Sequence, residues 1–164
     1  MAGEPRIRRV GPGVFEVRIP KAHREILRGL PGQLRSIIHS DHPGLRRFFP
    51  PAYPDDPVRA AEYDAMVREE LVAGRKKSLE IMERTIDADR LDADLMADWL
   101  SALNDLRLFL GTSLDVTEEI YQEPIGEDDP NAQALAIFSY LGWLEEQAIE
   151  ALAGDLQEPA EPDR

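Results

Sequence analysis

The sequence of 164 residues contains no cysteine, only three histidines and no hydrophobic run long enough to span a membrane. The absence of cysteine excludes disulfides, thiolate metal sites and a cysteine nucleophile within this chain. A membrane helix needs about 20 consecutive apolar residues, and the first residues also lack the apolar run of a signal peptide. We therefore expect a soluble, cytoplasmic protein, since a chain without cysteine fits a reducing compartment.

Positive charge is scarce as well: 19 Lys and Arg stand against 32 Asp and Glu, which gives a formal net charge of −13. This balance argues against direct binding to nucleic acid, because neutralising phosphates requires clustered Lys and Arg. Residues 1–47 nevertheless hold 10 basic and 4 acidic side chains, whereas residues 48–164 hold 9 and 28. Either the basic N-terminal segment packs against an acidic helical body, or two oppositely charged faces meet two different partners.

Catalytic and cofactor motifs are also missing. Gly11-Pro12-Gly13 is typical of a turn and does not match a phosphate-binding loop, and no serine lies in a recognisable nucleophile motif. His39 and His42 have no evident third metal ligand, and the Pro-Gly that follows them favours a capped helix end. The aspartates between residues 87 and 98 lack the glycine and the closing glutamate of a calcium loop. The sequence thus predicts a non-enzymatic protein without cofactor or metal.

The hydrophobic pattern predicts a mainly α-helical single domain over residues 1–154, with a β-hairpin over residues 6–19 and a helical body of five or six helices over residues 21–154. In the hairpin, apolar and polar residues alternate on either side of the Gly-Pro-Gly turn. An isolated hairpin is marginally stable in water, so we expect it to lie against a helix.

Helical spacing and capping residues predict four helical regions. They are residues 21–40 with a break at 29–32, residues 57 to about 86 as one or two helices, residues 92–110, and residues 131–154. Asp56, Asp92 and Asn131 are the predicted N-caps. Between them we expect a proline-rich connector at 48–54, a short turn from Asp115 or Thr117 and an acidic loop at 124–130, and we expect 155–164 to be a disordered tail.

The helix predicted over residues 92–110 is apolar around most of its circumference, which is typical of a buried central helix. Five of its residues share one face at spacings of three and four: Leu95, Trp99, Leu103, Leu106 and Leu110. Its clearly polar strip consists of Asp98, Ser101 and Asp105, and Gly111 is the expected C-terminal cap.

Asn104, Asp105, Arg107 and Gly111 are the candidate structural or partner-binding residues of this helix. Asn104 and Arg107 lie towards the flank of the apolar side, which leaves two interpretations open. Arg107 is hydrogen-bonded to a helix end or to a carboxylate of a neighbouring helix, with Asn104 satisfied internally. Alternatively, the two form a polar patch for a partner or a small anion, because the planar fork of arginine binds carboxylates and phosphates.

Three segments together resemble the AosR-like family of actinobacterial oxidative-stress regulators. They are FPPAY at residues 49–53 with the helix that follows, the block at residues 99–119, and YLGWL at residues 140–144. With the hairpin they cover nearly the whole chain in order. The resemblance implies a regulator that binds a sigma factor or another RNA polymerase component under oxidative stress. Redox sensing in this family is attributed to a cysteine pair, so a thiol switch within this chain is excluded.

Two alternatives remain open. Genes of the family are typically found beside that of the ClpS adaptor, which implies an accessory factor of ClpS/Clp proteolysis. An enzyme with an unrecognised site near Asn104 and Arg107 is the other alternative.

Overall fold

The computed structural model describes residues 4–40, 42–48, 57–114 and 131–157. Along the chain its elements are β1 (Ile7–Gly11), β2 (Val14–Val17), α1 (Lys21–Arg28), α2 (Leu30–Ile37), the 3-10 turn η1 (Pro43–Leu45), α3 (Pro57–Arg84), β3 (Arg90–Asp92), α4 (Ala93–Ser113) and α6 (Ala132–Gln157). The predicted fold class, mainly helical with an N-terminal hairpin, is confirmed. None of the described helices is long and apolar enough to cross a membrane.

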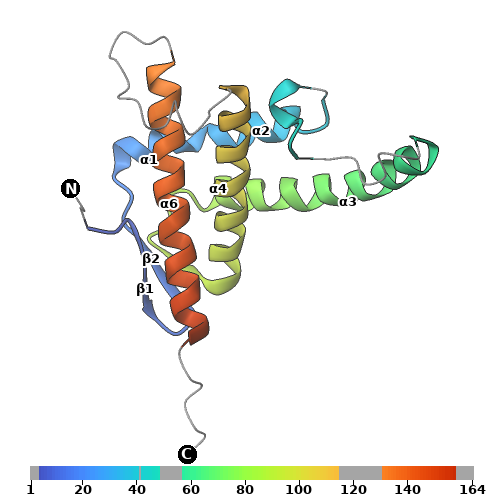
Figure 1. Ribbon diagram of the computed structural model, residues 1–164. Helices are drawn as coiled ribbons and strands as arrows, with labels where there is room; N and C mark the ends of the chain where they lie inside the picture. Colours follow the sequence, from blue (N-terminus) through green and yellow to red (C-terminus); the bar gives the residue numbers. More distant parts are fainter. Residues whose placement is uncertain (1–3, 41, 49–56, 115–130, 158–164) are drawn as a thin grey trace, which may run out of the picture.

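Two long helices, α4 and α6, lie side by side and run in opposite directions, while α3 crosses them and projects to one side (Figure 1). The helices α1 and α2 are separate, with the break at Gly29 where the sequence predicts it. The pattern over residues 57–84 forms one continuous helix, which settles the choice between one helix and two.

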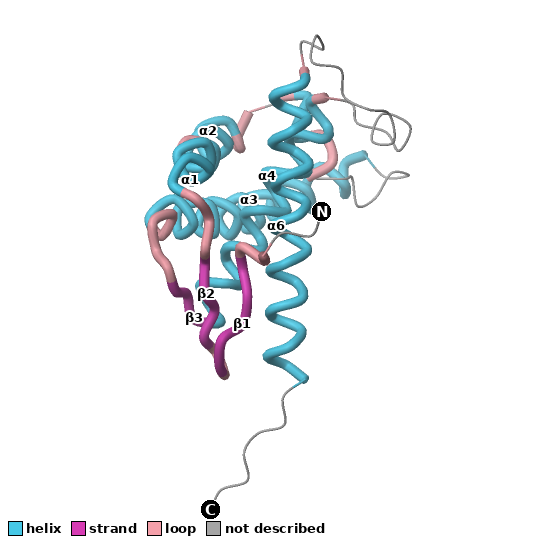
Figure 2. The backbone as a smooth tube through the Cα atoms, turned by 90° about the vertical axis from the view of Figure 1, so that its left-hand side faces the viewer, coloured by secondary structure: helices cyan, strands magenta, loops and turns pink. Residues whose placement is uncertain are grey.

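The predicted hairpin is part of a three-stranded antiparallel sheet in the order β1-β2-β3, which lies beside α6 (Figure 2). Gly13 has a φ of 64°, a left-handed conformation that glycine adopts without a Cβ clash. The hairpin lies against α6 as expected: the side-chain oxygen of Gln147 accepts hydrogen bonds from the backbone N–H groups of Arg6 at 2.6 Å and Ile7 at 2.9 Å. The strand β3 was not predicted, because its three residues are too few to show an alternating pattern.

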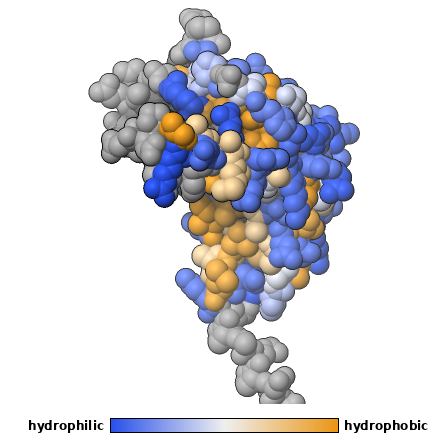
Figure 3. Space-filling view, turned by 90° about the vertical axis from the view of Figure 1, so that its right-hand side faces the viewer, coloured by the Kyte–Doolittle hydropathy of each residue, from blue (hydrophilic) through white to orange (hydrophobic). Residues whose placement is uncertain are grey.

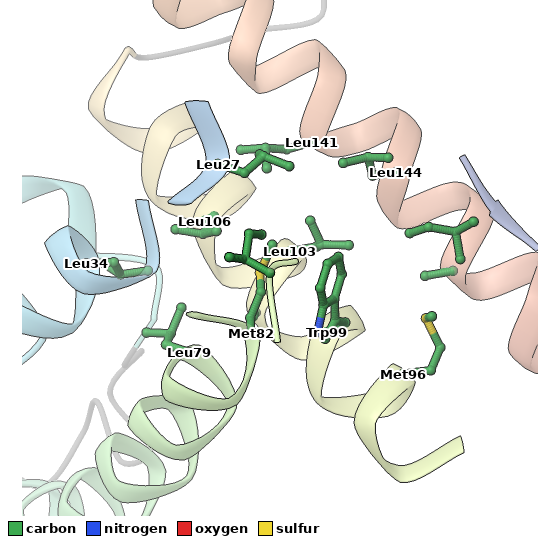
Figure 4. Close-up of a cluster of buried hydrophobic side chains, with 14 of the residues drawn as sticks. Leu27, Leu34, Leu79, Met82, Met96, Trp99, Leu103, Leu106, Leu141 and Leu144 are labelled. Carbon is green, nitrogen blue, oxygen red and sulfur yellow. The ribbon is translucent and has the colours of Figure 1, made fainter. Parts of the chain in front are cut away.

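One core joins the helices and the sheet (Figure 4). Trp99 and Leu103 of α4 are fully buried, and they are surrounded by side chains from the other helices. The labelled neighbours are Leu27 and Leu34 from α1 and α2, Leu79 and Met82 from α3, and Leu141 and Leu144 from α6. The prediction of α4 as the buried central helix is therefore correct.

The basic N-terminal segment makes ion pairs with the acidic body. Arg9 pairs with Asp155 of α6 at 2.8 Å, Arg28 with Asp87 at 2.8 Å, and Arg35 with Glu83 of α3 at 2.8 Å. These contacts support the first interpretation of the uneven charge, in which the N-terminal segment packs on the helical body.

The C-terminal helix continues beyond the predicted boundary of the domain. The expected disordered tail from residue 155 starts too early, since α6 runs to Gln157. The reason is a tertiary contact: the carboxylate of Asp155 accepts hydrogen bonds from Arg9 Nε at 2.8 Å and from the backbone N–H of Gly13 at 2.7 Å. The expectations for residues 49–54, Asp56, 115–117, 124–130 and 158–164 lie outside the described residues.

The contact between Asp155 and the hairpin predicts a specific pH dependence. The Gly13 N–H first, and the Arg9 guanidinium second, hold the pKa of Asp155 below its ordinary value. A carboxyl whose pKa is lower in the folded than in the unfolded state stabilises the fold at pH values above its unfolded-state pKa. This stabilisation is lost as the pH falls through the folded-state pKa. We therefore expect Asp155→Asn to lower stability at neutral pH and to lose less stability on acidification than the parent chain. Urea denaturation at neutral and acidic pH measures both, with the exposed Glu150→Gln on the same helix as control.

Candidate functional site on the central helix

The central helix α4 begins at the predicted cap. The carboxylate of Asp92 accepts a hydrogen bond from the backbone N–H of Leu95 at 2.8 Å, which satisfies one of the free donors of the first turn. From this start the helix packs on α3 along one side and on α6 along another. The candidate residues lie in its last three turns.

Asp105, in the polar strip of α4, lies in the interface with α3. It is 3% exposed and forms an ion pair with Arg75 of α3. Two turns earlier, Ser78 of α3 donates a hydrogen bond to Asp98 at 3.0 Å. Two of the three residues of the strip, Asp98 and Asp105, thus have polar partners on α3.

Burial dominates the electrostatics of Asp105. Desolvation raises the pKa of this carboxyl above its ordinary value, although the charge and the hydrogen bond of Arg75 act in the opposite direction. The guanidinium of Arg75 also lies over the ring of Phe48, 4.6 Å from its centroid. Asp105 is thus part of the packing between α3 and α4, with a structural role.

Arg107 lies two residues further along and faces α6. Its Nη1 donates a hydrogen bond to Oε2 of Glu145 at 2.9 Å, which is the neighbouring-helix carboxylate that the structural interpretation describes. Nevertheless the Arg107 side chain is 47% exposed, while that of Glu145 is 9% exposed. Asn104 is exposed as well, so both residues are accessible to a ligand or a partner.

Gly111 does not cap α4, so that expectation is wrong. The helix continues to Ser113, and Leu114 is its C-terminal cap. A Cβ atom at Gly111 would come within 2.9 Å of the ring of Phe138 on α6, closer than real Cβ contacts. The glycine is therefore required by the close approach of α4 and α6.

Asn104, Arg107 and Gly111 line one pocket of about 290 Å³. The rest of its lining is Arg47, Leu108, Thr112 and Phe138, none of which was predicted as a site residue. Asp105 instead lines a neighbouring hollow with Arg75, and Asn104 lines both. The structure therefore brings three of the four candidates together in one pocket and places Asp105 outside it.

Apart from Thr112 of α4 itself, the residues near the pocket that were not predicted lie far from α4 in the chain. Arg47 follows η1, and Phe138 and Glu145 come from α6. No spacing rule connects them with Arg107, because their proximity depends on how η1 and α6 pack on α4. Glu145 was anticipated in part: the sequence predicted that Arg107 could pair with a carboxylate of a neighbouring helix, but not which residue supplies it.

The histidines form no metal site in the described part of the chain. His42 instead caps η1: its Nδ1 accepts a hydrogen bond from the backbone N–H of Gly44 at 2.9 Å. Among the described residues, no three His, Asp or Glu side chains are grouped closely enough to hold a metal ion. The aspartates from residue 87 onward form caps and ion pairs, as with Asp92 and with Asp87.

Comparison with known proteins gives a match to one protein family. A family model described as "Domain of unknown function (DUF2017)" matches residues 4–152. No curated protein and no solved structure matches the chain. The matched range includes the hairpin, the helical body up to residue 152 in α6 and every residue of the pocket.

Proposed function

We propose that this chain, which belongs to the DUF2017 family of unknown function, is a non-enzymatic regulator that binds a sigma factor or another RNA polymerase component. The resemblance to AosR-like oxidative-stress regulators suggests this class of partner. The observation that carries the proposal is the composition of the solvent-exposed face of α6.

That face combines apolar side chains with carboxylates. Trp143 is 37% exposed, Ile149 48% and Leu156 87%, and the exposed Glu146 and Glu150 lie between them in sequence. Tryptophan is enriched among the residues that contribute most to protein–protein binding. Acidic residues around such an anchor favour a basic partner and accelerate encounter with it. We call these five residues the α6 face.

Exposed apolar surface supports a docking role. Apolar surface, shown in orange, gathers on the lower part of the face in Figure 3. Contiguous exposed apolar surface on a soluble protein commonly marks an interaction site. A DNA-binding region of a sigma factor would offer the basic surface that the carboxylates require.

The direct test is binding of the purified full chain to an extracytoplasmic-function sigma factor and to RNA polymerase from the same organism. We expect binding that weakens as ionic strength rises, because screening reduces the attraction between exposed charges. Glu146→Lys combined with Glu150→Lys should reduce the affinity, and so should Trp143→Ala. The matched control is Glu70→Lys combined with Glu80→Lys, which reverses two exposed charges on α3.

The absence of cysteine sharpens the test. Treating this chain alone with the thiol oxidant diamide before mixing should leave the affinity unchanged, since it contains no thiol. Any redox response must then come from the partner. Failure to bind either transcription component at low salt, with the partners both reduced and oxidised, would refute the proposal.

A further inference from the structure

We propose that the pocket lined by Arg47, Asn104, Arg107, Thr112 and Phe138 binds a small organic anion, a carboxylate or phosphate monoester with an apolar portion. We call it the Arg47–Arg107 pocket. This inference concerns a ligand of the chain itself and does not depend on the protein partner proposed above.

Two guanidinium groups line this pocket in a strongly acidic protein. Arg47 is exposed, and no carboxylate among the described residues pairs with it. Arg107 uses Nη1 for Glu145, and an arginine carries five N–H donors. Its remaining donors therefore face no described acceptor. Glu145 is already paired, so Arg47 leaves the pocket with an excess of positive charge.

The hydroxyl of Thr112 provides an independent indication of a ligand. Thr112 is 3% exposed, and its Oγ1 is buried without a hydrogen-bond partner. Buried polar atoms in folded proteins are almost always paired, and an unpaired one calls for an explanation. Thr112 also lines the pocket, so a ligand oxygen that reaches this hydroxyl would supply the missing partner. The amide of the exposed Asn104, which also hydrogen-bonds Asp105, lines the same pocket and carries two N–H donors.

The apolar part of the lining limits the kind of anion. The ring of Phe138 lies 5.8 Å from the Arg107 guanidinium carbon, and Leu108 lines the pocket beside it. A ligand that fills the space thus contacts apolar surface as well as arginine. The volume of about 290 Å³ lies at the lower end of the roughly 300–1,000 Å³ typical of small-molecule sites. A small anion with an apolar portion fits these walls better than a bare inorganic ion.

The test uses the isotope-labelled full chain and three aromatic probes of similar size, observed by NMR. Benzoate and phenyl phosphate carry the two anionic groups, and benzyl alcohol is the neutral control. We expect saturable chemical-shift changes at the amides of Gly111 and Thr112 with at least one anion and not with the alcohol. Comparing the two anions shows which headgroup the pocket prefers.

Variants then locate the site. Arg47→Gln should weaken anion binding by about tenfold or more, because it removes a charge-assisted contact, and Thr112→Val should weaken it without changing the net charge. Arg107→Lys retains a charge beside Glu145 and should bind less tightly than the parent chain, since lysine lacks the planar fork. Arg84→Gln, an exposed arginine at the end of α3, is the matched control and should bind normally.

Three results would overturn the inference. They are the absence of saturable shifts with both anions, equal binding of the alcohol, and unchanged binding in Arg47→Gln and Thr112→Val. Sigma-factor binding measured on the same variants separates the two proposals. A chain that binds its protein partner but no anion refutes this inference alone, and the reverse result refutes the proposed function alone.

Discussion

Replacing Trp99 with alanine is expected to lower the free energy of unfolding by about 3–5 kcal/mol, the range for removing a large aromatic side chain from a packed core. Trp99 has no solvent exposure, and its ring lies among side chains from α3, α4 and α6 (Figure 4). Its indole Nε1 also donates a hydrogen bond to Oγ1 of Thr85 at 2.7 Å. Because small domains are stable by only about 5–15 kcal/mol in total, this variant should be close to unfolding at ambient temperature.

Urea denaturation followed by far-UV circular dichroism measures the loss. Trp99→Phe keeps most of the ring packing and loses the hydrogen bond, so it should be less destabilising than alanine. Trp143→Ala removes the partly exposed tryptophan of the α6 face and should cost clearly less stability. Equal stabilities for the two alanine variants would contradict the position of Trp99 in the core.

The core was predictable because it follows local periodicity. Trp99, Leu103 and Leu106 are spaced by four and three residues, and this spacing places them on one face of any α-helix. The helix start at Asp92 was predictable for a similar reason, since a side-chain cap acts within three residues of itself. Both features are encoded within a single element of the sequence.

The candidate site was less predictable because it depends on contacts between elements. The helical wheel placed Asp105 in a polar strip and Arg107 at the flank of the buried side, yet Asp105 is buried against Arg75 and Arg107 is about half exposed. Which side of α4 is covered depends on where α3 lies, and the pattern of α4 alone does not contain this information. Gly111 is a second example, because a side chain at this position would collide with Phe138 on α6. The sequence marks the glycine but does not show this contact.

Arg24 is the clearest case of an important residue without a local sequence signal. Its guanidinium is buried and donates hydrogen bonds to four backbone carbonyl oxygens and to the carboxylate of Asp89. The carbonyls belong to Val17 at 3.1 Å, Ile19 at 2.7 Å, Ile86 at 3.0 Å and Ala88 at 3.1 Å. One side chain on α1 thus ties the end of β2 to the segment between α3 and β3.

Arg24→Met is therefore expected to destabilise the protein by about 3 kcal/mol or more, because a buried acceptor that loses its partner costs about 1–3 kcal/mol. Methionine retains much of the aliphatic stem, so the loss reports the hydrogen bonds more than the packing. Arg24→Lys should not restore stability, since one ammonium group cannot reach acceptors arranged around a planar fork. Arg28→Met provides the matched control: Arg28 lies on the same helix and pairs with Asp87 at the surface, so its loss should change stability little.

Hydrogen exchange distinguishes a local from a global effect of Arg24→Met. If Arg24 joins the sheet to the helical body, the amides that pair β2 with β3, at residues 14–16 and 90–92, should lose more protection than those in the middle of α4. The parts of a fold open with different free energies. Loss of a contact that joins the sheet to the helices should therefore lower mainly the opening free energy of the sheet. Uniform loss of protection would show that Arg24 supports the whole core, and unchanged stability would show that the carbonyls find water as an equivalent partner.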